Sequence, residues 1–509
     1  MTSGLWGLDG FPVTVECFSD RGLPNIEIIG LPDAALKEAI GRISAACRNN
    51  GLPFVKGRTT VSLAPADMKK AGSSYDLAIL TSLLKQNILS EIPLDDMCFV
   101  GELSLAGDLR PCKGVLSMCI AAKEAGLKQI FVPAENADEA ALVDGLTVYG
   151  ISHVRDMIRH LLGEQLLFPT PSPMINTPLN VAGEIDFADI KGQIYAKRAI
   201  EIAAAGGHNI LLIGPPGSGK SMLAKALPGI LPPMEFSEML ESTKIHSIAG
   251  TLPIQGGENK SRRISVRPFR APHHTMSPVG LSGGGSIPAP GEISLAHNGV
   301  LFLDELPEYE KKSLEVLRQP LEDRRITITR ASGKVTFPTH FMLVCAMNPC
   351  PCGYYGSEQR TCTCTHQAMD RYIGKISGPL LDRIDMHIEV PAVSFGEITS
   401  SAKAESSETV RQRVTAARER AIRRYRDIGV TSNGALSGKQ TKEYCRYDDD
   451  AAALLSAAFD RMHLSARAYD RILRVARTIA DLADSDIITG DHVLEAVQMR
   501  SLDRKYFGE

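Results

Sequence analysis

The segment from Gly214 to Ser221 carries residue types that bind phosphate. It reads GPPGSGKS and follows the apolar run 210–213. Its glycines allow a tight turn whose backbone N–H groups face an anion, and a helix that begins near Ser221 would point its positive end at the same place. Lys220 would then reach the β- and γ-phosphates of a nucleoside triphosphate, and the Ser221 hydroxyl would bind Mg²⁺. The predicted phosphate loop comprises Gly214, Pro215, Pro216, Gly217, Ser218, Gly219, Lys220 and Ser221.

Two further apolar runs end in polar residues suited to hydrolysis of that nucleotide. The run 299–303 leads directly into Asp304 and Glu305, and the run 341–347 leads into Asn348. Buried parallel strands read as continuous apolar segments and deliver side chains at their carboxyl ends, where ligands bind. Asp304 would hold Mg²⁺ through water, Glu305 would polarise the attacking water, and the Asn348 amide would orient it. The alternative for the two acids is a strand followed by an acidic turn.

Four of the 11 cysteines form two C-x-C pairs that are separated by nine residues. Two such pairs joined by a turn can place four thiolates around Zn²⁺, and the predicted zinc is structural because four protein ligands leave no open position. Free thiols or a redox pair remain the alternative, and His366 could replace one cysteine as a ligand. The predicted ligands are Cys350, Cys352, Cys362 and Cys364.

A basic insert separates the phosphate loop from the paired acids. It contains Arg270, His273 and His274, followed by the glycine run 283–285. Because basic, glycine-rich loops can lie close to a phosphate backbone, these residues are predicted to contact DNA.

A second basic segment, 325–337, has two alternating β-type runs that flank Ala-Ser-Gly. This pattern predicts a hairpin with Arg330 and Lys334 near its tip. Neither basic segment has an interleaved aromatic residue that would stack on bases, so we expect contact with the DNA backbone without reading of the base sequence. A solvated basic face is the alternative for both.

The elements that must position these residues fall into several parts. A length of 509 residues suggests about three domains. The proline-rich stretch 168–180 predicts an extended tether, and a polar stretch near 400–407 precedes a part of the chain with helical periodicity. That periodicity appears at Ile472, Val475, Ile479 and Leu482. The predicted units are 1–167, a linker at 168–186, a nucleotide domain at 187–397 and a helical domain at 398–509.

The composition excludes several classes of protein. No apolar run approaches the roughly 20 residues that span a bilayer, and the first residues lack a secretion signal, so we expect a cytoplasmic protein without a membrane partner. A net charge of −3 confines any binding of nucleic acid to local patches. The odd number of cysteines, most of them single within apolar stretches, argues against a disulfide scaffold.

The order of the motifs resembles the AAA+ ATPases, with Walker A at 214–221, Walker B at Asp304 and Glu305, and sensor 1 at Asn348. Over nearly the whole chain the pattern is similar to the ComM/YifB family, a magnesium-chelatase-like branch with an additional N-terminal domain. The segments that carry this narrower resemblance are FRAPHH at 269–274, PGEISLAH at 290–297, LFLDELP at 301–307 and SGPLLDRID at 377–385.

The resemblance implies an α/β AAA+ P-loop domain, a C-terminal α-helical lid and assembly into a homo-oligomeric ring, expected to be a hexamer. It also implies that Arg383 is the arginine finger that completes the site of the neighbouring subunit, and that Arg467 is sensor 2. A guanidinium near the γ-phosphate offsets charge that builds up in the transition state.

The N-terminal part resembles the proteolytic domain of Lon, an α/β fold of the S5 domain 2 type. The segments GELSLAGDLRP at 101–111 and KKAGSS at 69–74 carry this resemblance, and Ser74 falls at the nucleophile position. The position of the activating lysine is matched by Met118, and Lys113 is out of register. A serine without a base stays protonated and weakly nucleophilic, so we expect a proteolytically inactive domain kept for assembly or for binding DNA.

Two functions from different classes remain open, and both use ATP and Mg²⁺. The family resemblance implies a ring-shaped DNA helicase that drives branch migration on single-stranded and branched DNA while transforming DNA integrates. The alternative is a chelatase-type ATPase that remodels a protein partner. A third possibility, an ATP-dependent protease, depends on Ser74.

Overall fold

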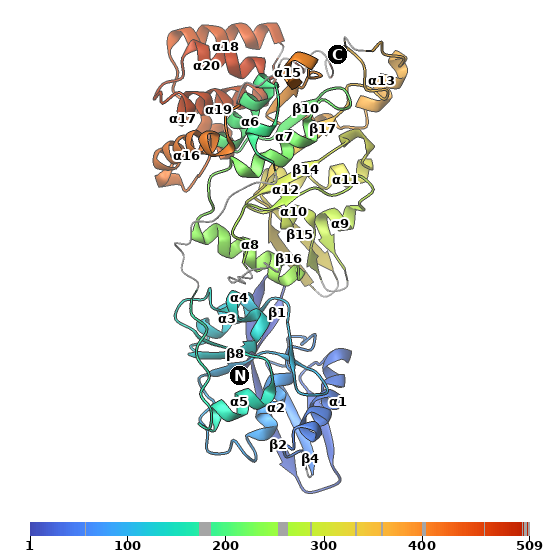
Figure 1. Cartoon of the computed structure of the whole chain (residues 1–509), viewed down its shortest axis with the longest axis vertical. Coiled ribbons are helices and arrows are strands. Elements are labelled where there is room, and N and C mark those ends of the chain that lie inside the picture. The colour runs from blue at the N-terminus through green and yellow to red at the C-terminus, as the bar shows by residue number, and fades with distance from the viewer. Residues whose placement is uncertain are drawn as a thin grey trace.

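The chain is elongated, with an α/β body at its N-terminal end, a parallel sheet in the middle and a group of helices at the far end (Figure 1). This computed structural model describes residues 1–55, 57–172, 185–252, 263–285, 288–330, 333–357, 360–399, 404–462, 464–500, 502 and 506. Most of the predicted tether, at 173–184, therefore lies outside the described residues, as does the hairpin tip at 331–332. Within the described ranges, no helix is long and apolar enough to cross a membrane.

Two sheets form the N-terminal body. In the strand β4 (Arg58–Ala64), buried and more exposed residues alternate, which gives the sheet one face for a core. The helix α1 (Ala34–Asn49) begins at Asp33, whose carboxylate accepts a hydrogen bond from the Leu36 N–H. The first sheet has the order β1-β2-β4-β3, with β1 (Thr2–Trp6), β2 (Asp9–Asp20) and β3 (Asn25–Ile29). The second has the parallel order β5-β8-β9, at Met97–Phe99, Gln129–Pro133 and Thr147–Ile151, and a short pair β6-β7 lies at Glu102–Leu103 and Leu109–Arg110. The remaining helices are α2 (Asp76–Leu84), α3 (Val115–Glu124), α4 (Ala137–Ala140) and α5 (Val154–Leu161).

A five-stranded parallel sheet forms the centre of the molecule. The apolar runs predicted as buried strands are confirmed, and their residues are buried without interruption. Successive residues of β10 (Ile210–Ile213) face two different cores: Ile210 and Leu212 join one, whereas Leu211 and Ile213 join the other. The strand order is β11-β14-β17-β10-β18, at Phe269–Arg270, Val300–Leu303, Met342–Met347, Ile210–Ile213 and Met386–Glu389.

Helices and small hairpins surround this sheet. The predicted hairpin is confirmed as β15 (Arg325–Arg330) and β16 (Gly333–Pro338), paired in a continuous antiparallel register. A second small pair joins β12 (Gly283–Gly284) and β13 (Ala289–Pro290). The helices are α6 (Ile194–Gly206), α7 (Lys220–Ala226), α8 (Phe236–Ala249), α9 (Pro278–Ser282), α10 (Glu292–Leu295), α11 (Lys311–Glu315), α12 (Arg318–Asp323), α13 (His366–Ile373) and α14 (Gly378–Leu381).

The C-terminal part is helical, as predicted. On α19 (Ala466–Leu482) the residues Ile472, Val475 and Ile479 are buried, and they share one core with α6 and the sheet. Leu482 packs against the edge of that core. The other helices here are α15 (Phe395–Thr399), α16 (Ser407–Arg424), α17 (Gly438–Tyr444), α18 (Asp449–Met462) and α20 (Gly490–Gln498).

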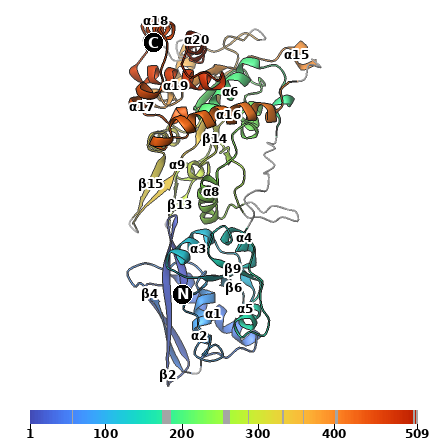
Figure 2. The ribbon, with the colours of Figure 1, turned by 90° about the vertical axis from the view of Figure 1, so that its left-hand side faces the viewer.

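The N-terminal body packs against the central part through α8, which lies next to α3 and α4 (Figure 2). The Gly114 N–H donates to the Ser247 carbonyl at 3.1 Å, and the Ser247 hydroxyl donates to Glu139 at 2.6 Å. Lys244 of α8 pairs with Asp9 at 2.8 Å. The turn between β1 and β2 therefore lies close to α8.

The same turn also contacts the β15–β16 hairpin. A Cβ atom built on Gly333 would lie 2.5 Å from Cζ2 of Trp6, and one built on Gly7 would lie 2.6 Å from a methyl group of Val335. Both glycines also have positive φ angles. The close approach of backbone to side chain at both positions leaves room only for glycine.

Candidate nucleotide site and cysteine cluster

The predicted phosphate loop follows β10 and leads directly into α7. Gly217 and Gly219 have φ angles of 75° and 92°, in the left-handed region that glycine adopts without strain. A Cβ atom on Gly214 would lie 2.1 Å from the Val390 carbonyl oxygen, so the loop also passes close to the end of β18. These glycines therefore allow the tight turn that the sequence predicted.

Lys220 reaches back across this loop. Its Nζ donates to the carbonyl oxygens of Gly214 at 2.8 Å and Pro215 at 2.9 Å, and it lies 3.3 Å from Oδ1 of Asn348. Burial lowers the pKa of Lys220 to about 8, and the nearby Asp304 carboxylate partly offsets this effect. The ammonium group is thus held between the loop and the end of β17.

The two residues predicted to hold Mg²⁺ lie next to each other. The Ser221 hydroxyl donates to Oδ2 of Asp304 at 2.7 Å. Ser221 comes from the first turn of α7, and Asp304 follows the carboxyl end of β14. A hydroxyl and a carboxylate oxygen at this separation fit a divalent cation that prefers oxygen ligands.

Glu305 has a left-handed backbone, with φ at 52°, and its exposed carboxylate lies 3.1 Å from Nδ1 of His274. The His274 ring packs at 4.1 Å from the ring of His273, whose Nδ1 lies 2.9 Å from the Thr275 hydroxyl. The Tyr309 hydroxyl fixes this segment by donating to the Pro272 carbonyl at 2.6 Å. The structure therefore places His274, which the sequence assigned to DNA, beside the predicted water-polarising acid.

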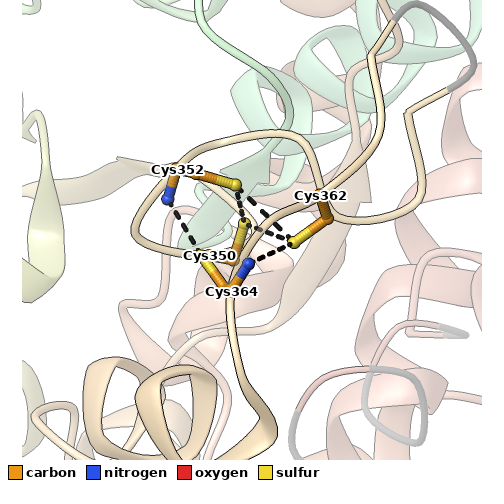
Figure 3. Close-up of side chains that lie close together, drawn as sticks. All are labelled: Cys350, Cys352, Cys362 and Cys364. Atoms are coloured by element: carbon orange, nitrogen blue, oxygen red, sulfur yellow. Dashed lines mark hydrogen bonds between the residues drawn. The ribbon is translucent and has the colours of Figure 1, made fainter.

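The cysteine cluster lies close to the same edge of the sheet (Figure 3). All four sulfur atoms lie within 4.8 Å of one another. Sγ of Cys350 lies 3.4 Å from that of Cys352 and 3.7 Å from that of Cys362, and the Cys352 and Cys362 sulfurs are 3.6 Å apart. Four sulfurs at ~2.3 Å from one zinc ion would have tetrahedral edges of about 3.8 Å, so the cluster fits such an ion. Among the described residues, the four cysteines form this group without His366, which begins α13.

The loop that carries Cys350 and Cys352 touches the phosphate loop. Gly353 has a φ of 87°, and a Cβ atom there would lie 2.6 Å from Cδ of Pro216 and 3.8 Å from Cγ of Asn348. Two backbone N–H groups, those of Cys352 and Cys364, donate to sulfur atoms of the cluster at 3.3 and 3.4 Å. The cluster thus anchors a segment that covers Pro216.

Arg383 and Arg467 lie at the opposite, amino-terminal edge of the sheet. Asn209 and Asp385 precede the parallel strands β10 and β18 and exchange hydrogen bonds of 3.0 Å. A strand of four residues separates this edge from the phosphate loop by roughly 13 Å. Both arginines line a cavity of about 300 Å³ at this edge, so neither is placed on the nucleotide loop of its own chain.

Sequence reasoning missed three other arginines in this cavity, Arg324, Arg471 and Arg474. Arg471 and Arg474 lie 3.5 and 3.9 Å from the Asp385 carboxylate. Although burial opposes ionisation, His208 and these two arginines hold the pKa of Asp385 below its usual value. Arg383 pairs with Glu322 at 2.5 Å. No sequence signal could have found this group, because its members extend from 324 to 474.

The other residues assigned to DNA have different surroundings. Arg270 forms a bidentate pair with Glu292, at 2.6 and 2.7 Å, so its charge is compensated. Arg330 and Lys334 are exposed near the end of the β15–β16 hairpin, as the sequence predicted. Among the described residues, neither Arg330 nor Lys334 shares a hydrogen-bond or ion-pair partner with Arg270.

Ser74 and the two residues compared with the activating lysine lie in different surroundings. Ser74 is buried, Met118 is buried within α3, and Lys113 lies against Gly250 of the central part. The buried amine of Lys70 donates to the Pro65 carbonyl. Within the described residues, no hydrogen bond joins a lysine to the Ser74 hydroxyl. The proteolytic inactivity of this domain stays a prediction.

Comparisons with known proteins agree with this arrangement. A family model for magnesium chelatase, subunit ChlI, matches residues 186–398, a model for subunit ChlI of Mg-chelatase matches 15–136, and a model for the C-terminal part of ChlI matches 404–500. The uncharacterized protein YifB of Escherichia coli K12 is 42% identical over 99% of this chain and 97% of its own length. Competence protein ComM of Haemophilus influenzae is 41% identical over 97% of this chain and 95% of its own length.

A weaker similarity connects the chain with a protease. Lon protease of Brucella suis is 25% identical over 30% of this chain and 20% of its own length. This match is partial, whereas the matches to YifB and ComM extend over almost all of both chains. The chain therefore belongs to the ComM/YifB family of magnesium-chelatase-like AAA+ proteins.

Proposed function

We propose that the protein is an ATP hydrolase that works as a ring-shaped DNA motor. One observation carries the hydrolase assignment: Lys220, Ser221, Asp304, Glu305 and Asn348 meet at the carboxyl edge of one parallel sheet. These residues follow the carboxyl ends of three separate strands, β10, β14 and β17, and each has a chemical role that suits phosphoryl transfer to water.

The residues divide the work of hydrolysis. Lys220 neutralises charge on the β- and γ-phosphates, and Asn348, which already contacts Lys220, orients the water. Ser221 and Asp304 would hold Mg²⁺, which supplies positive charge to the phosphates. The Glu305 carboxylate accepts a proton from the attacking water, and His274 holds that carboxylate in place at 3.1 Å.

Arg383 and Arg467 act on the nucleotide of a neighbouring subunit in this proposal. Their position at the amino edge, away from the phosphate loop of their own chain, supports an active site shared between subunits of a homo-oligomeric ring, which we propose is a hexamer. Mixing Arg383→Ala subunits with Lys220→Ala subunits tests this idea. Mixed rings should regain part of the ATPase activity, because some interfaces then pair one intact half from each variant.

DNA is the proposed substrate of the motor. The competence protein name of one relative and the exposed Arg330 and Lys334 support this choice. We propose that the ring moves single-stranded and branched DNA and promotes branch migration during natural transformation. Branch migration of a synthetic three-strand junction by the wild type, but not by Lys220→Ala, tests the assignment. Failure of the wild type with ATP would count against it.

We further propose that Cys350, Cys352, Cys362 and Cys364 hold a structural Zn²⁺. The sulfur separations support this, and zinc bound by four thiolates has no open position for chemistry. Its contribution is to fix the segment that covers Pro216. Elemental analysis of protein purified without chelators should find about one zinc per chain.

A chelatase-type ATPase that remodels a protein partner is the second candidate. The family descriptions, which name a magnesium chelatase subunit, favour it. The ATPase rate with and without forked DNA separates the two functions. Strong stimulation by DNA supports the motor, whereas an unchanged rate supports the remodelling ATPase.

A further inference from the structure

The cavity at the amino edge of the central sheet has the character of an anion site. Five arginines and two carboxylates line its 300 Å³, which gives an excess of three positive charges. The Arg471 side chain is almost fully buried, and its Nη1 has no hydrogen-bond partner among the described residues. Within the same ranges, Nε of Arg383 and Nε of Arg474 also lack partners. Buried N–H groups of this kind are costly unless a ligand satisfies them.

The arginines of this cavity are held to different degrees. Arg474 donates to the carbonyl oxygens of Gly434 and Leu436, and with Arg471 it faces Asp385, so these two groups are fixed. Arg324 and Arg467 are exposed and make no ion pair with any described residue. Arg324 and Arg467 are therefore the two guanidinium groups most able to move toward an anion.

Arg324 occupies the junction between this cavity and the β15–β16 hairpin. It follows the last residue of α12, has a left-handed backbone with φ at 53°, and is followed at once by β15. Its carbonyl oxygen accepts a hydrogen bond of 2.9 Å from the Thr339 N–H, just below the first pair of the hairpin ladder. A displacement of Arg324 therefore moves the base of the hairpin.

The hairpin can transmit such a displacement to its other end. Six consecutive residue pairs, from Arg325↔Pro338 to Arg330↔Gly333, connect the base with the exposed end. At that end Gly333 lies against the ring of Trp6, which is the single tryptophan of the chain. The fluorescence of Trp6 therefore reports the position of the hairpin end relative to the N-terminal body.

The shared active site proposed above puts the terminal phosphates of a neighbouring subunit's nucleotide at this cavity. We propose that Arg324 is a positioning residue that couples binding of those phosphates to the hairpin. The proposal rests on the shared active site proposed above and adds to it the link to the exposed basic end. A nucleoside triphosphate matches the positive excess of the cavity. In a ring, nucleotide binding at one subunit would then move the hairpin of the next.

The test measures Trp6 fluorescence while ATP is added to rings of Glu305→Gln, in which bound nucleotide is not consumed. We expect an ATP-dependent change in the parent that is lost in Glu305→Gln with Arg324→Ala. The matched control is Arg325→Ala, which removes the adjacent exposed arginine outside the cavity and should retain the change. ATP binding, followed with a fluorescent nucleotide, should remain within about twofold in both variants because the phosphate loop is intact.

A second measurement uses the intact active site. Arg324→Ala alone should lower kcat for ATP by about tenfold, with KM changed less than about twofold. A full Trp6 response in the Arg324→Ala background would overturn the proposal, and so would the absence of any response in the parent. A different result would show that the active site is not shared between subunits: mixed Arg383→Ala and Lys220→Ala rings would regain no ATPase activity. The two proposals can therefore fail independently.

Discussion

The two edges of the central parallel sheet differ in how their polar residues are satisfied. At the carboxyl edge, Lys220 donates to carbonyl oxygens of the phosphate loop and Ser221 donates to Asp304, all within one chain. At the amino edge, five arginines and two carboxylates line a cavity, and several of the arginine N–H groups have no partner in the part of the chain that the structure describes. At the first edge the polar groups are bonded within the chain, whereas at the second edge several arginine N–H groups are left for an anion from outside the chain.

The largest expected effect comes from the amino edge. Arg383→Ala should reduce the ATPase rate by about 10³-fold while leaving ATP binding nearly unchanged, because its guanidinium acts on transition-state charge. Arg371→Ala, which removes an exposed arginine of α13 outside the cavity, is the control and should retain the wild-type rate. Steady-state ATPase assays and nucleotide titrations provide both values. A wild-type ATPase rate in Arg383→Ala would contradict the proposal that the amino edge acts on a neighbouring subunit's nucleotide.

Loss of the proposed proton acceptor, Glu305, should have the next largest effect. Glu305→Gln should lower ATP turnover by about 10²-fold and leave the protein assembled with ATP bound, because a positioned base contributes about that factor. Glu308→Gln, which disrupts an exposed pair with Lys375, is the matched control. Single-turnover hydrolysis measures the effect, and rapid turnover by Glu305→Gln would show that another residue activates the water.

The lowered pKa of Lys220 predicts how ATP binding depends on pH. The free protein carries the ammonium below pH 8 and loses it above that value, whereas bound phosphates require the charged form. ATP binding should therefore weaken about tenfold between pH 8 and pH 9 and should take up a proton in this range. Calorimetry in two buffers with different ionisation enthalpies measures both quantities. Affinity that stays constant up to pH 9 would contradict the assigned environment of Lys220.

The smallest effect is expected at the cysteine cluster. Its loop contacts Pro216 of the phosphate loop, at the carboxyl edge of the sheet. Cys362→Ser should abolish bound zinc and lower the melting temperature by about 5 °C, since metal binding contributes to folding. Cys17→Ser changes a half-buried cysteine of β2 and should keep the metal. Elemental analysis and thermal unfolding provide the readouts. Protein with intact cysteines but without zinc would argue for a thiol or redox role.

The sequence predicted the carboxyl edge better than the amino edge for a physical reason. The phosphate loop and the pair Asp304 and Glu305 are local patterns, in which neighbouring residues act together at the end of one strand. The arginine cavity brings together the end of α12, the residues that precede β18, and α19 only after folding, so spacing along the chain carried no sign of it. His274 was assigned to DNA from local charge, since nothing in the sequence places it 3.1 Å from Glu305.

The fold likewise has features that local sequence patterns predict and features that arise only from long-range packing. Unbroken apolar runs predicted the central strands, and helical periodicity predicted the burial of Ile472, Val475 and Ile479. The docking of the N-terminal body could not be predicted, because it depends on close contacts such as that between Gly333 and Trp6. Those contacts join residues more than 300 positions apart in the chain.

The helix α8 has a further consequence for how this protein can change over evolutionary time. Its Met239 belongs to the hydrophobic core of the N-terminal body, while its Ser242 hydroxyl bonds to the His297 carbonyl of the central part. Deleting the N-terminal body would expose this apolar surface to water. The packing against α8 therefore constrains the shape of the N-terminal body, whatever chemistry that body performs.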